Sequence, residues 1–474
     1  MNLRFSDNSG RPDNSVGRRG SVLIVVLWIA FGLVSLALYF ADSMSFELRA
    51  SDNQVSGMTA DQAIDGAERY VNYLLSNLAE NGSNGIVPDP SSYQSQAVPV
   101  GDAHFWLIGR DTNNPVGPGR LCFGLVDEAS KLNLNTITSN QLTYLPRMTY
   151  DLTSAILDWR NTNGGGPTTT YYAMLPQPYQ CKNAPFETVD ELRLVYGTSM
   201  DILVGEDANR NGILDPNEND DNHNGMLDAG LVEYLTVYSR EPNTNASGSA
   251  KINISSLGAT TSATTQLSSL LETNLGTTRA QQILRTLGLN SGGGGRGGRG
   301  GGAGGVTTTV RFSSPLQFYM RSGMTAAEFA LIATNLTVST NSFIDGRVNV
   351  NTASAPVLAC LLNGELDTAQ QLVNYRQSNP NNLASIAWVV DALGQNYTAD
   401  LTTLASGDYI TTQSYQFTAD IAALGPHGRG YRRVRFVFDT SSGTPQIIYR
   451  QDLSHLGWAL GNDVRQKWLL AKGT

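Results

Sequence analysis

Apolar residues along the chain form one long uninterrupted run and then many short segments. Residues 21–40 carry no charge, and about twenty apolar residues, at roughly 1.5 Å each, cross a hydrocarbon core of about 30 Å. Beyond this run, apolar residues recur every three or four positions through Ile64, Ala67 and Val71, which is the period of a helix with one packed face. The pattern predicts one long helix over 21–80, half in a membrane and half packed on a domain.

Short runs rich in β-branched and aromatic residues predict a sheet built from two distant parts of the chain. They lie at 104–108, 121–126, 415–419, 431–438 and 446–449. In the fourth run, apolar Val434, Phe436 and Phe438 alternate with Arg433 and Arg435, as in an antiparallel sheet with one wet face. The sequence therefore predicts an α+β fold, in which a long helix packs on a small antiparallel sheet and residues 128–404 form a large, mainly helical inserted domain.

A polar phrase occurs three times within the inserted region and indicates an internal repeat. It reads Lys-Leu-Asn-Leu-Asn-Thr at 131–136, Lys-Ile-Asn-Ile-Ser-Ser at 251–256 and Arg-Val-Asn-Val-Asn-Thr at 347–352. Helical patterning follows each copy, so we expect the Asn and Thr side chains to cap the first free N–H groups of a helix.

The third copy resembles a helix-hairpin-helix module, a fold that often grips the DNA backbone. Such modules bind phosphate through a Gly-x-Gly hairpin, whereas this chain has Leu-Leu-Asn-Gly-Glu at 361–365. The net charge of −9 also opposes attraction to phosphate. We therefore expect a helical packing unit and no nucleic-acid partner.

The composition is that of a folded, exported protein of more than one lobe. Hydrophobic residues make up 41% and charged residues 15% of the 474 positions, and a chain of this length exceeds one hydrophobic core. The Gly-rich run at 291–305 lacks the Gly-Lys-Ser/Thr ending of a phosphate-binding loop. It predicts a flexible linker.

Few side chains carry reactive chemistry. The four histidines are scattered, and no nucleophile, zinc or phosphate motif is present, so we expect no enzymatic activity. Of the three cysteines, Cys122 and Cys181 are the favoured disulfide pair because both fall in or beside one segment. Free buried thiols are the open alternative.

The acidic stretch at 206–228 matches the spacing of an EF-hand calcium loop twice. Positions 1, 3, 5, 7, 9 and 12 of the first loop are Asp207, Asn209, Asn211, Ile213, Asp215 and Glu218. The second loop supplies Asp220, Asn222, Asn224, Met226 and Asp228. Its twelfth position is Leu231, so either Glu233 or a residue shared with the first loop would have to complete the shell.

The charge of this stretch favours bound calcium. It contains seven acidic residues and only one arginine, and the acidic residues would repel one another without a cation. Flanking helices long enough for a calcium sensor are not evident, so we expect the metal to order the insertion rather than to switch it.

Basic residues precede the apolar run and predict the topology. Arg4, Arg11, Arg18 and Arg19 keep the N-terminus cytoplasmic and send the rest of the chain across the membrane. Arg-Arg-Gly-Ser at 18–21, directly before the run, resembles the signal of prepilin peptidase, with cleavage between Gly20 and Ser21. A plain signal anchor with an uncleaved basic tail is the alternative.

The fifth position after that cleavage site is Val25, where most pilins and pseudopilins carry Glu. The chain resembles the one family that lacks this Glu, the minor pseudopilin K of type II secretion systems. A Glu buried in lipid needs a partner on the preceding subunit, which a tip subunit does not have. The phrases at 127–135, 158–160, 183–192 and 235–239 also resemble this family, whereas an extra helical repeat and the Gly-rich run depart from it.

The resemblance implies a pilin-like fold with four parts. They are a leader (1–20), a transmembrane and pilin-type helix (21–80), a sheet domain (81–127 and 405–460) and the inserted domain (128–404) with its calcium loops. Members of this family are known to bind calcium in this part of the fold, which supports the metal prediction.

The implied function is that of a non-catalytic subunit at the pseudopilus tip, which supports protein export across the outer membrane. The implied partners are the I and J types of minor pseudopilin, the pseudopilus and prepilin peptidase. The chain would cross the bacterial inner membrane once, with its bulk in the periplasm. The alternative is a membrane-anchored extracytoplasmic calcium-binding or substrate-binding protein unrelated to a pilus.

Overall fold

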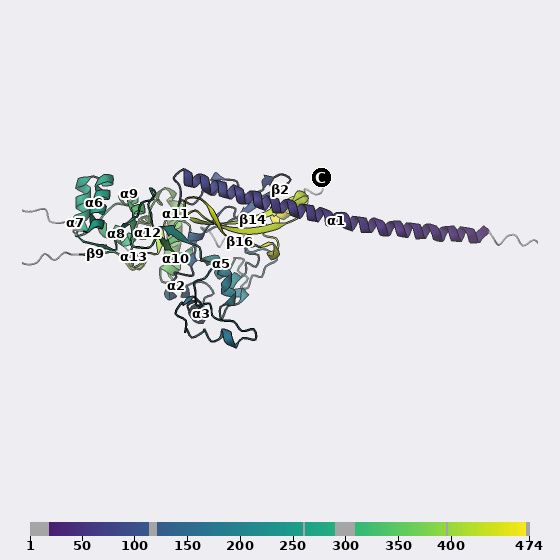
Figure 1. Ribbon diagram of the computed structural model, residues 1–474, viewed down its shortest axis with the longest axis horizontal. Coiled ribbons are helices and arrows are strands. Elements are labelled where there is room, and N and C mark those ends of the chain that lie inside the picture. Colours follow the sequence, from purple (N-terminus) through teal and green to yellow (C-terminus); the bar gives the residue numbers. More distant parts are fainter. Residues whose placement is uncertain (1–18, 113–120, 259–260, 290–308, 395–396, 471–474) are drawn as a thin grey trace, which may run out of the picture.

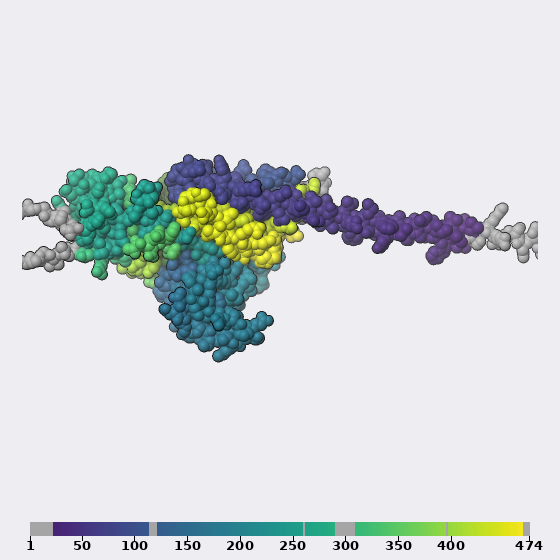
Figure 2. Space-filling view, in the orientation of Figure 1, coloured from purple at the N-terminus to yellow at the C-terminus, as the bar shows by residue number. Residues whose placement is uncertain are grey.

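One long helix dominates the shape of the molecule. The computed structural model describes residues 19–112, 121–258, 261–289, 309–394 and 397–470. Helix α1 runs over Arg19–Glu80, a length of about 90 Å, and its N-terminal half stands clear of the rest of the chain (Figures 1 and 2). Within the described residues it is the one helix long and apolar enough to cross a membrane. Residues 1–18 of the predicted leader lie outside the described residues.

The C-terminal half of α1 packs on an antiparallel sheet with the strand order β1-β2-β14-β15-β16, to which β3 adds by pairing with β14. The strands are β1 (Val98–Val100), β2 (Ala103–Ile108), β3 (Val126–Asp127), β14 (Gln416–Leu424), β15 (Arg432–Asp439) and β16 (Gln446–Asp452). The pilin-like α+β prediction is therefore confirmed. The predicted strand over 121–126 was wrong except at its end, because Gly124, with φ of 152°, interrupts it and leaves one bridge between Phe123 and Ile108.

The core under α1 pairs small residues of the helix with large residues of the sheet. Ala60, Ala63 and Ala67 are fully buried, and their short side chains let the helix approach the strands closely. Buried Phe105, Leu107, Phe417, Ile421, Phe436 and Phe438 complete this cluster from the sheet.

One turn and two ion pairs attach α1 to the sheet near the point where the helix leaves it. Arg429 pairs with Asp52 at 2.6 Å and Arg432 with Asp61 at 3.0 Å. Gly430, with φ of +67°, touches the helix backbone so closely that a Cβ atom there would lie 2.3 Å from the carbonyl carbon of Ser56. This contact can be made only by a residue without a side chain.

The inserted domain consists of three units of one design. Unit 1 spans 131–239, unit 2 spans 251–339 and unit 3 spans 347–414. In each unit the polar phrase pairs in parallel with a later strand: β4 (Leu132–Asn133) with β5 (Leu235–Thr236), β7 (Ile252–Asn253) with β10 (Leu336–Thr337) and β12 (Val348–Asn349) with β13 (Ile410–Thr411).

Short helices fill each unit between its two strands. Unit 1 holds α2 (Ser139–Thr143), α3 (Tyr150–Arg160), α4 (Met200–Val204) and α5 (Leu231–Tyr234); unit 2 holds α6 (Ser262–Leu275), α7 (Thr277–Thr286), α8 (Pro315–Ser322) and α9 (Ala326–Ala330); unit 3 holds α10 (Ala355–Leu361), α11 (Leu366–Ser378), α12 (Trp388–Leu393) and α13 (Thr398–Ala405). Strands β8 (Ser256–Leu257) and β9 (Val310–Arg311) pair within unit 2. The Gly-rich run at 291–305 lies outside the described residues.

The geometry that the three units share comes from their asparagines. The Oδ1 atoms of Asn133, Asn253 and Asn349 each accept the backbone N–H two residues ahead at 2.9 Å. The expected capping of helices by these residues was wrong, because the N-caps are other residues, such as Thr138 and Thr261. The asparagines instead form a turn that ends the first strand of each unit.

Unit 2 enters and leaves through a two-stranded stem, in which β6 (Arg240–Pro242) pairs with β11 (Phe343–Asp345). The N–H of Gly346 donates to the carbonyl oxygen of Ser239 at 3.0 Å, so the two ends of the insert meet at the base of the stem. Its helices α6 and α7 lie at the end of the molecule farthest from the free half of α1 (Figure 1).

The predicted disulfide between Cys122 and Cys181 was wrong, because none of the three cysteines forms a disulfide. Cys181 is buried in unit 1, where its Sγ lies 3.7 Å from the carbonyl oxygen of Asp158. Cys122 lies at the edge of the sheet, where its carbonyl oxygen accepts the N–H of Gly109. Nearness in sequence did not bring the two together, since they belong to different lobes.

We expect Gly430→Ala to lower the unfolding free energy by at least about 3 kcal/mol, because the new Cβ would push Ser56 off the turn. Gly443→Ala is the matched control, since Gly443 also has a positive φ, of +88°, but open space around it. Its cost should be about 1 kcal/mol from backbone strain alone. Urea unfolding of the detergent-solubilised chain measures both, and equal losses would contradict the close contact.

Candidate metal site

The first acidic loop has the backbone geometry that its spacing predicts. The carboxylate of Asp207 accepts the N–H groups of Asn211 and Gly212, both at 2.8 Å. The Oδ1 atoms of Asn209 and Asn211 accept the N–H groups two residues ahead, both at 3.0 Å. The tight turn depends on Gly212, whose φ is +85°. Side-chain oxygens from positions 1, 3 and 5 are thereby gathered on the inside of one loop.

Glu218 closes this loop from position 12. Its two carboxylate oxygens accept the N–H groups of Asn209 at 3.1 Å and Asp215 at 2.9 Å. The side chain therefore reaches back across the loop opening, as the twelfth residue of an EF-hand loop does.

The second loop repeats these contacts position by position. The carboxylate of Asp220 accepts the N–H of Gly225 at 2.8 Å, and Asn222 and Asn224 accept the N–H groups of Asn224 and Met226. Asp228, at position 9, accepts from the side-chain amide of Asn222. The two loops thus bring together the predicted site residues in two adjacent groups.

Sequence reasoning missed Glu206, which occupies in the second loop the place that Glu218 has in the first. Its carboxylate is buried and accepts the N–H groups of Asp221 and Asp228, both at 2.8 Å. Glu233, one of the two candidates for this place, instead pairs with Arg110 at 2.8 Å. The sequence did contain a signal for this role. Glu206 is an acidic residue directly before the first loop, and it fills none of the ligand positions of that loop.

The loops differ in their surroundings. Asp207, Asn209, Asn211 and Asp215 are buried, whereas the side chains of the second loop are largely exposed. The first loop lies where the inserted domain meets the sheet, so its backbone carbonyls face side chains from another lobe.

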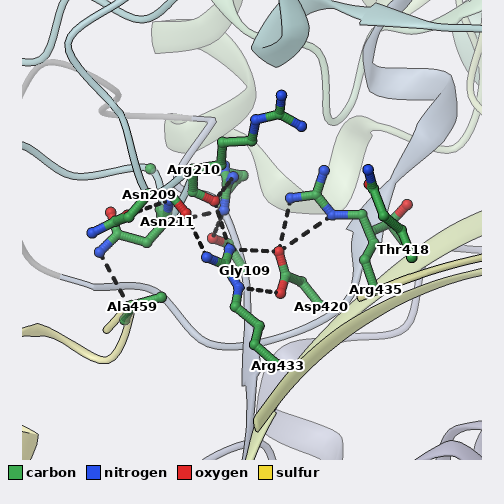
Figure 3. A network of polar contacts seen from close by, with 12 residues as sticks. Gly109, Asn209, Arg210, Asn211, Thr418, Asp420, Arg433, Arg435 and Ala459 are labelled. Atoms are coloured by element: carbon green, nitrogen blue, oxygen red, sulfur yellow. Dashed lines mark hydrogen bonds and ion pairs between the residues drawn. The ribbon is translucent and has the colours of Figure 1, made fainter. Parts of the chain in front are cut away.

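Two arginines of the sheet domain hold the carbonyls of the first loop, and Figure 3 shows one of them, Arg433. Arg433, fully buried on β15, donates to the carbonyl oxygens of Asn209 and Arg210. Arg110, which follows β2, donates to those of Arg210 at 3.0 Å and Asn211 at 3.3 Å. Buried Asp420 on β14 in turn pairs with Arg433 and with Arg435, both at 2.8 Å.

Burial changes the acidity of the loop. It raises the pKa of Glu218 to about 7, although two backbone N–H groups act in the opposite direction. Burial also raises the pKa of Asp207, against the lowering effect of the Arg110 charge. At Asp420, burial alone would raise the pKa, but Arg433 and Arg435 bring it well below its usual value. Nearby arginines therefore neutralise Glu218 and Asp207 of the loop less fully than they neutralise Asp420 of the sheet.

Carboxylates alone do not make a metal site here. Within the described parts of the chain, no three His, Cys, Asp or Glu side chains gather closely enough to hold a metal ion. Any cation in either loop would also need the amide oxygens of its two asparagines and a backbone carbonyl, which are the ligands of EF-hand loops.

Comparison with known protein families gives a match in the third unit of the inserted domain. Residues 348–405, which form most of unit 3, match the family model described as type II secretion system protein K. This match supports the prediction of the type II secretion system protein K family. A member of this family is a minor pseudopilin of the secretion system, so the predicted family and general function are confirmed.

Among solved structures, the chain is similar to one chain of the GspK-GspI-GspJ complex from the type 2 secretion system of enterotoxigenic Escherichia coli. The sequence identity is 10% and the TM-score 0.42, over 86% of this chain and 99% of that chain. Among curated proteins, none matches this chain.

Without a divalent cation, we expect the unfolding free energy to fall as the pH rises from about 4.5 to about 7. Folded Glu218 keeps its proton up to about pH 7, whereas in the unfolded chain its pKa is 4.5, so the folded state binds more protons in this window. Urea unfolding in chelator across this window measures the slope. Glu218→Gln should make it shallower, and Glu187→Gln, at a carboxylate whose side chain is 83% exposed, should not. Equal slopes in both variants would contradict the raised pKa.

Proposed function

We propose that this minor pseudopilin is the tip subunit of its pseudopilus, a non-catalytic assembly protein that supports export across the outer membrane. Val25 and its neighbours form an uncharged apolar helix surface throughout the predicted span, with no carboxylate that would need a partner on a preceding subunit. The bulk of the inserted domain extends beyond the sheet, away from the free half of α1 (Figure 1). A body of this size on that side would hinder a further subunit from stacking there, which supports a terminal position.

The topology of the proposal follows from α1. The basic residues before the helix favour a cytoplasmic N-terminus, which gives one crossing of the inner membrane and a periplasmic bulk. Prepilin peptidase would cleave between Gly20 and Ser21, and the mature chain would begin with the apolar helix itself.

The observation that carries the assembly role is an exposed apolar stripe on α1 between the predicted span and the sheet. Met44, Leu48, Val55 and Met58 are 57–67% exposed, and their spacing of four, seven and three residues places them on one side of the helix. This side is distinct from the one that packs on the sheet. An apolar helix face outside lipid requires a partner, and the α1 helices of the I and J types of pseudopilin fit this chemistry.

We also propose that both acidic loops bind calcium. Carboxylate, amide and carbonyl oxygens are the ligands that calcium prefers, and the buried carboxylates of the first loop need a positive charge. Asp207, Asn209, Asn211, Ile213, Asp215 and Glu218 would hold one ion. Asp220, Asn222, Asn224, Met226 and Asp228, with Glu206 in the closing place, would hold the other.

Calcium would neutralise the loop charge and order the inserted domain. Unit 1 enters the loops from α4 and leaves them at α5, and these two helices contact each other. A cation that fixes the loops therefore fixes this helix pair as well.

Titration of the full chain by calorimetry should detect two calcium ions. At 100-fold excess over the dissociation constant, each site should stabilise the fold by about 2.7 kcal/mol and raise Tm by about 2 to 4 °C relative to chelator. Glu218→Gln should lose one ion. Binding should be weaker at pH 6 than at pH 8, because protons compete for Glu218. An unchanged Tm in EDTA would contradict the calcium sites.

Leu48→Glu should abolish co-purification of the membrane-extracted chain with I-type and J-type pseudopilins, because it places a charge in the apolar stripe. Phe46→Glu is the matched control, since Phe46 and Leu48 are both 67% exposed but Phe46 lies on the other side of the helix. N-terminal sequencing of the captured chain should start at Ser21. Equal capture of both variants, or an intact Met1, would favour the anchored protein unrelated to a pilus.

A further inference from the structure

The two asparagines of the first loop act in two directions. Their Oδ1 atoms line the inside of the loop, whereas their Nδ2 atoms donate outward to backbone carbonyls of the chain after β16. Asn209 reaches the carbonyl oxygen of Trp458 and Asn211 that of Ala459, both at 3.2 Å. The second of these contacts is visible in Figure 3. Each Nδ2 also donates to Asp215 inside the loop.

This choice of residue has a chemical reason. Aspartate at positions 3 and 5 would offer a cation more negative charge, but a carboxylate cannot donate a hydrogen bond. Asparagine keeps one oxygen for the loop interior and adds a donor for the C-terminal chain. The amide therefore serves both sides at once.

The segment that receives these bonds, residues 458–461, is a packed part of the sheet domain. Ala459 and Leu460 are buried against Trp106, Ile108 and Leu424, on the sheet face opposite α1. The ring of Trp458 lies 5.3 Å from that of Tyr431. Helix α14 (Gly461–Leu470) follows directly and lies against the turn at 426–428, close to the place where α1 leaves the sheet.

The opposite side of the first loop is also attached to the sheet domain, by hydrogen bonds from two arginines. Arg433 and Arg110 donate to its carbonyls from β15 and from the end of β2. The loop is thus attached to the sheet domain at three places that are distant in sequence, and its shape and the position of the C-terminal segment depend on each other.

The second loop provides an internal comparison. Asn222 and Asn224 occupy the same loop positions, but they are exposed and the contacts described for their side chains lie within the loop. The outward contacts are therefore not a requirement of the loop motif itself.

We propose that a cation in the first loop locks the C-terminal segment 458–461, and with it α14, onto the sheet. The inference rests on the proposed calcium site. An ion that holds the Oδ1 atoms of Asn209 and Asn211 also fixes the direction of their Nδ2 atoms, and these hold the carbonyls of Trp458 and Ala459. By linkage, anything that attaches the segment also tightens the ion.

Hydrogen exchange of the full chain in detergent, with and without calcium chloride, tests the lock. We expect calcium to slow exchange in the peptide that covers 458–470 by about tenfold or more, which corresponds to about 1.4 kcal/mol. Calorimetry on the same samples counts the bound ions. If two ions bind and this peptide exchanges at an unchanged rate, the lock is wrong and the calcium sites stand. If no ion binds, the calcium sites are wrong and the lock is wrong with them.

Asn211→Asp separates binding from locking. It keeps an oxygen ligand at position 5 but places a carboxylate against the carbonyl of Ala459, so two ions should still bind while calcium no longer slows exchange at 458–470. Asn224→Asp, the same change at the same position of the second loop, should affect only the second ion and leave the calcium protection of 458–470 in place. Asn209→Asp repeats the test at Trp458. Calcium protection that survives in both first-loop variants would overturn the role of the amides.

Discussion

Two adjacent buried carboxylates, Asp127 and Glu128, join the lobes of this molecule. Asp127 accepts hydrogen bonds from Ser414 at 2.6 Å and Asn349 at 3.2 Å, both in unit 3. Glu128 accepts from Thr418 on β14 at 2.7 Å and from Lys131 in unit 1 at 2.9 Å. The side chains of consecutive residues therefore connect the sheet, unit 1 and unit 3, and the position of the inserted domain depends on them.

These contacts are costly to form and costly to break. Burial raises the pKa of Asp127 to about 6, even though three hydrogen bonds favour its charged form. At Glu128 burial has the same tendency, but Lys131 brings its pKa below the usual value. A buried carboxylate that loses its hydrogen-bond partners strongly destabilises the folded state. A small displacement of two packed apolar surfaces costs little folding free energy by comparison. A polar junction of this kind allows one arrangement of the lobes rather than several similar ones.

The same principle extends to the acidic loops and to the role of the molecule in the secretion system. Asp420, Arg433 and Arg110 connect the sheet with the first loop by directed hydrogen bonds. Helix α1 is attached to that sheet, and unit 2 lies at the far end of the inserted domain. A large domain carried on one long helix needs such rigid joints, because a flexible joint would not transmit position from the helix to the distal end.

The local features of this protein could be predicted from sequence alone. The span at 21–40, the helical period after it, the three Asn phrases and both loop spacings depend on residues that are neighbours in the chain. Their physics is local: helix period, turn formation by Asn and Gly, and the charge density of 206–228. Tertiary structure alone decided that Glu206 rather than Glu233 closes the second loop, that Cys122 and Cys181 lie in different lobes and that Asn211 reaches Ala459. These contacts join residues from separate parts of the fold, and their partners depend on how buried charges are paired once the lobes have packed, which no pattern along the chain records.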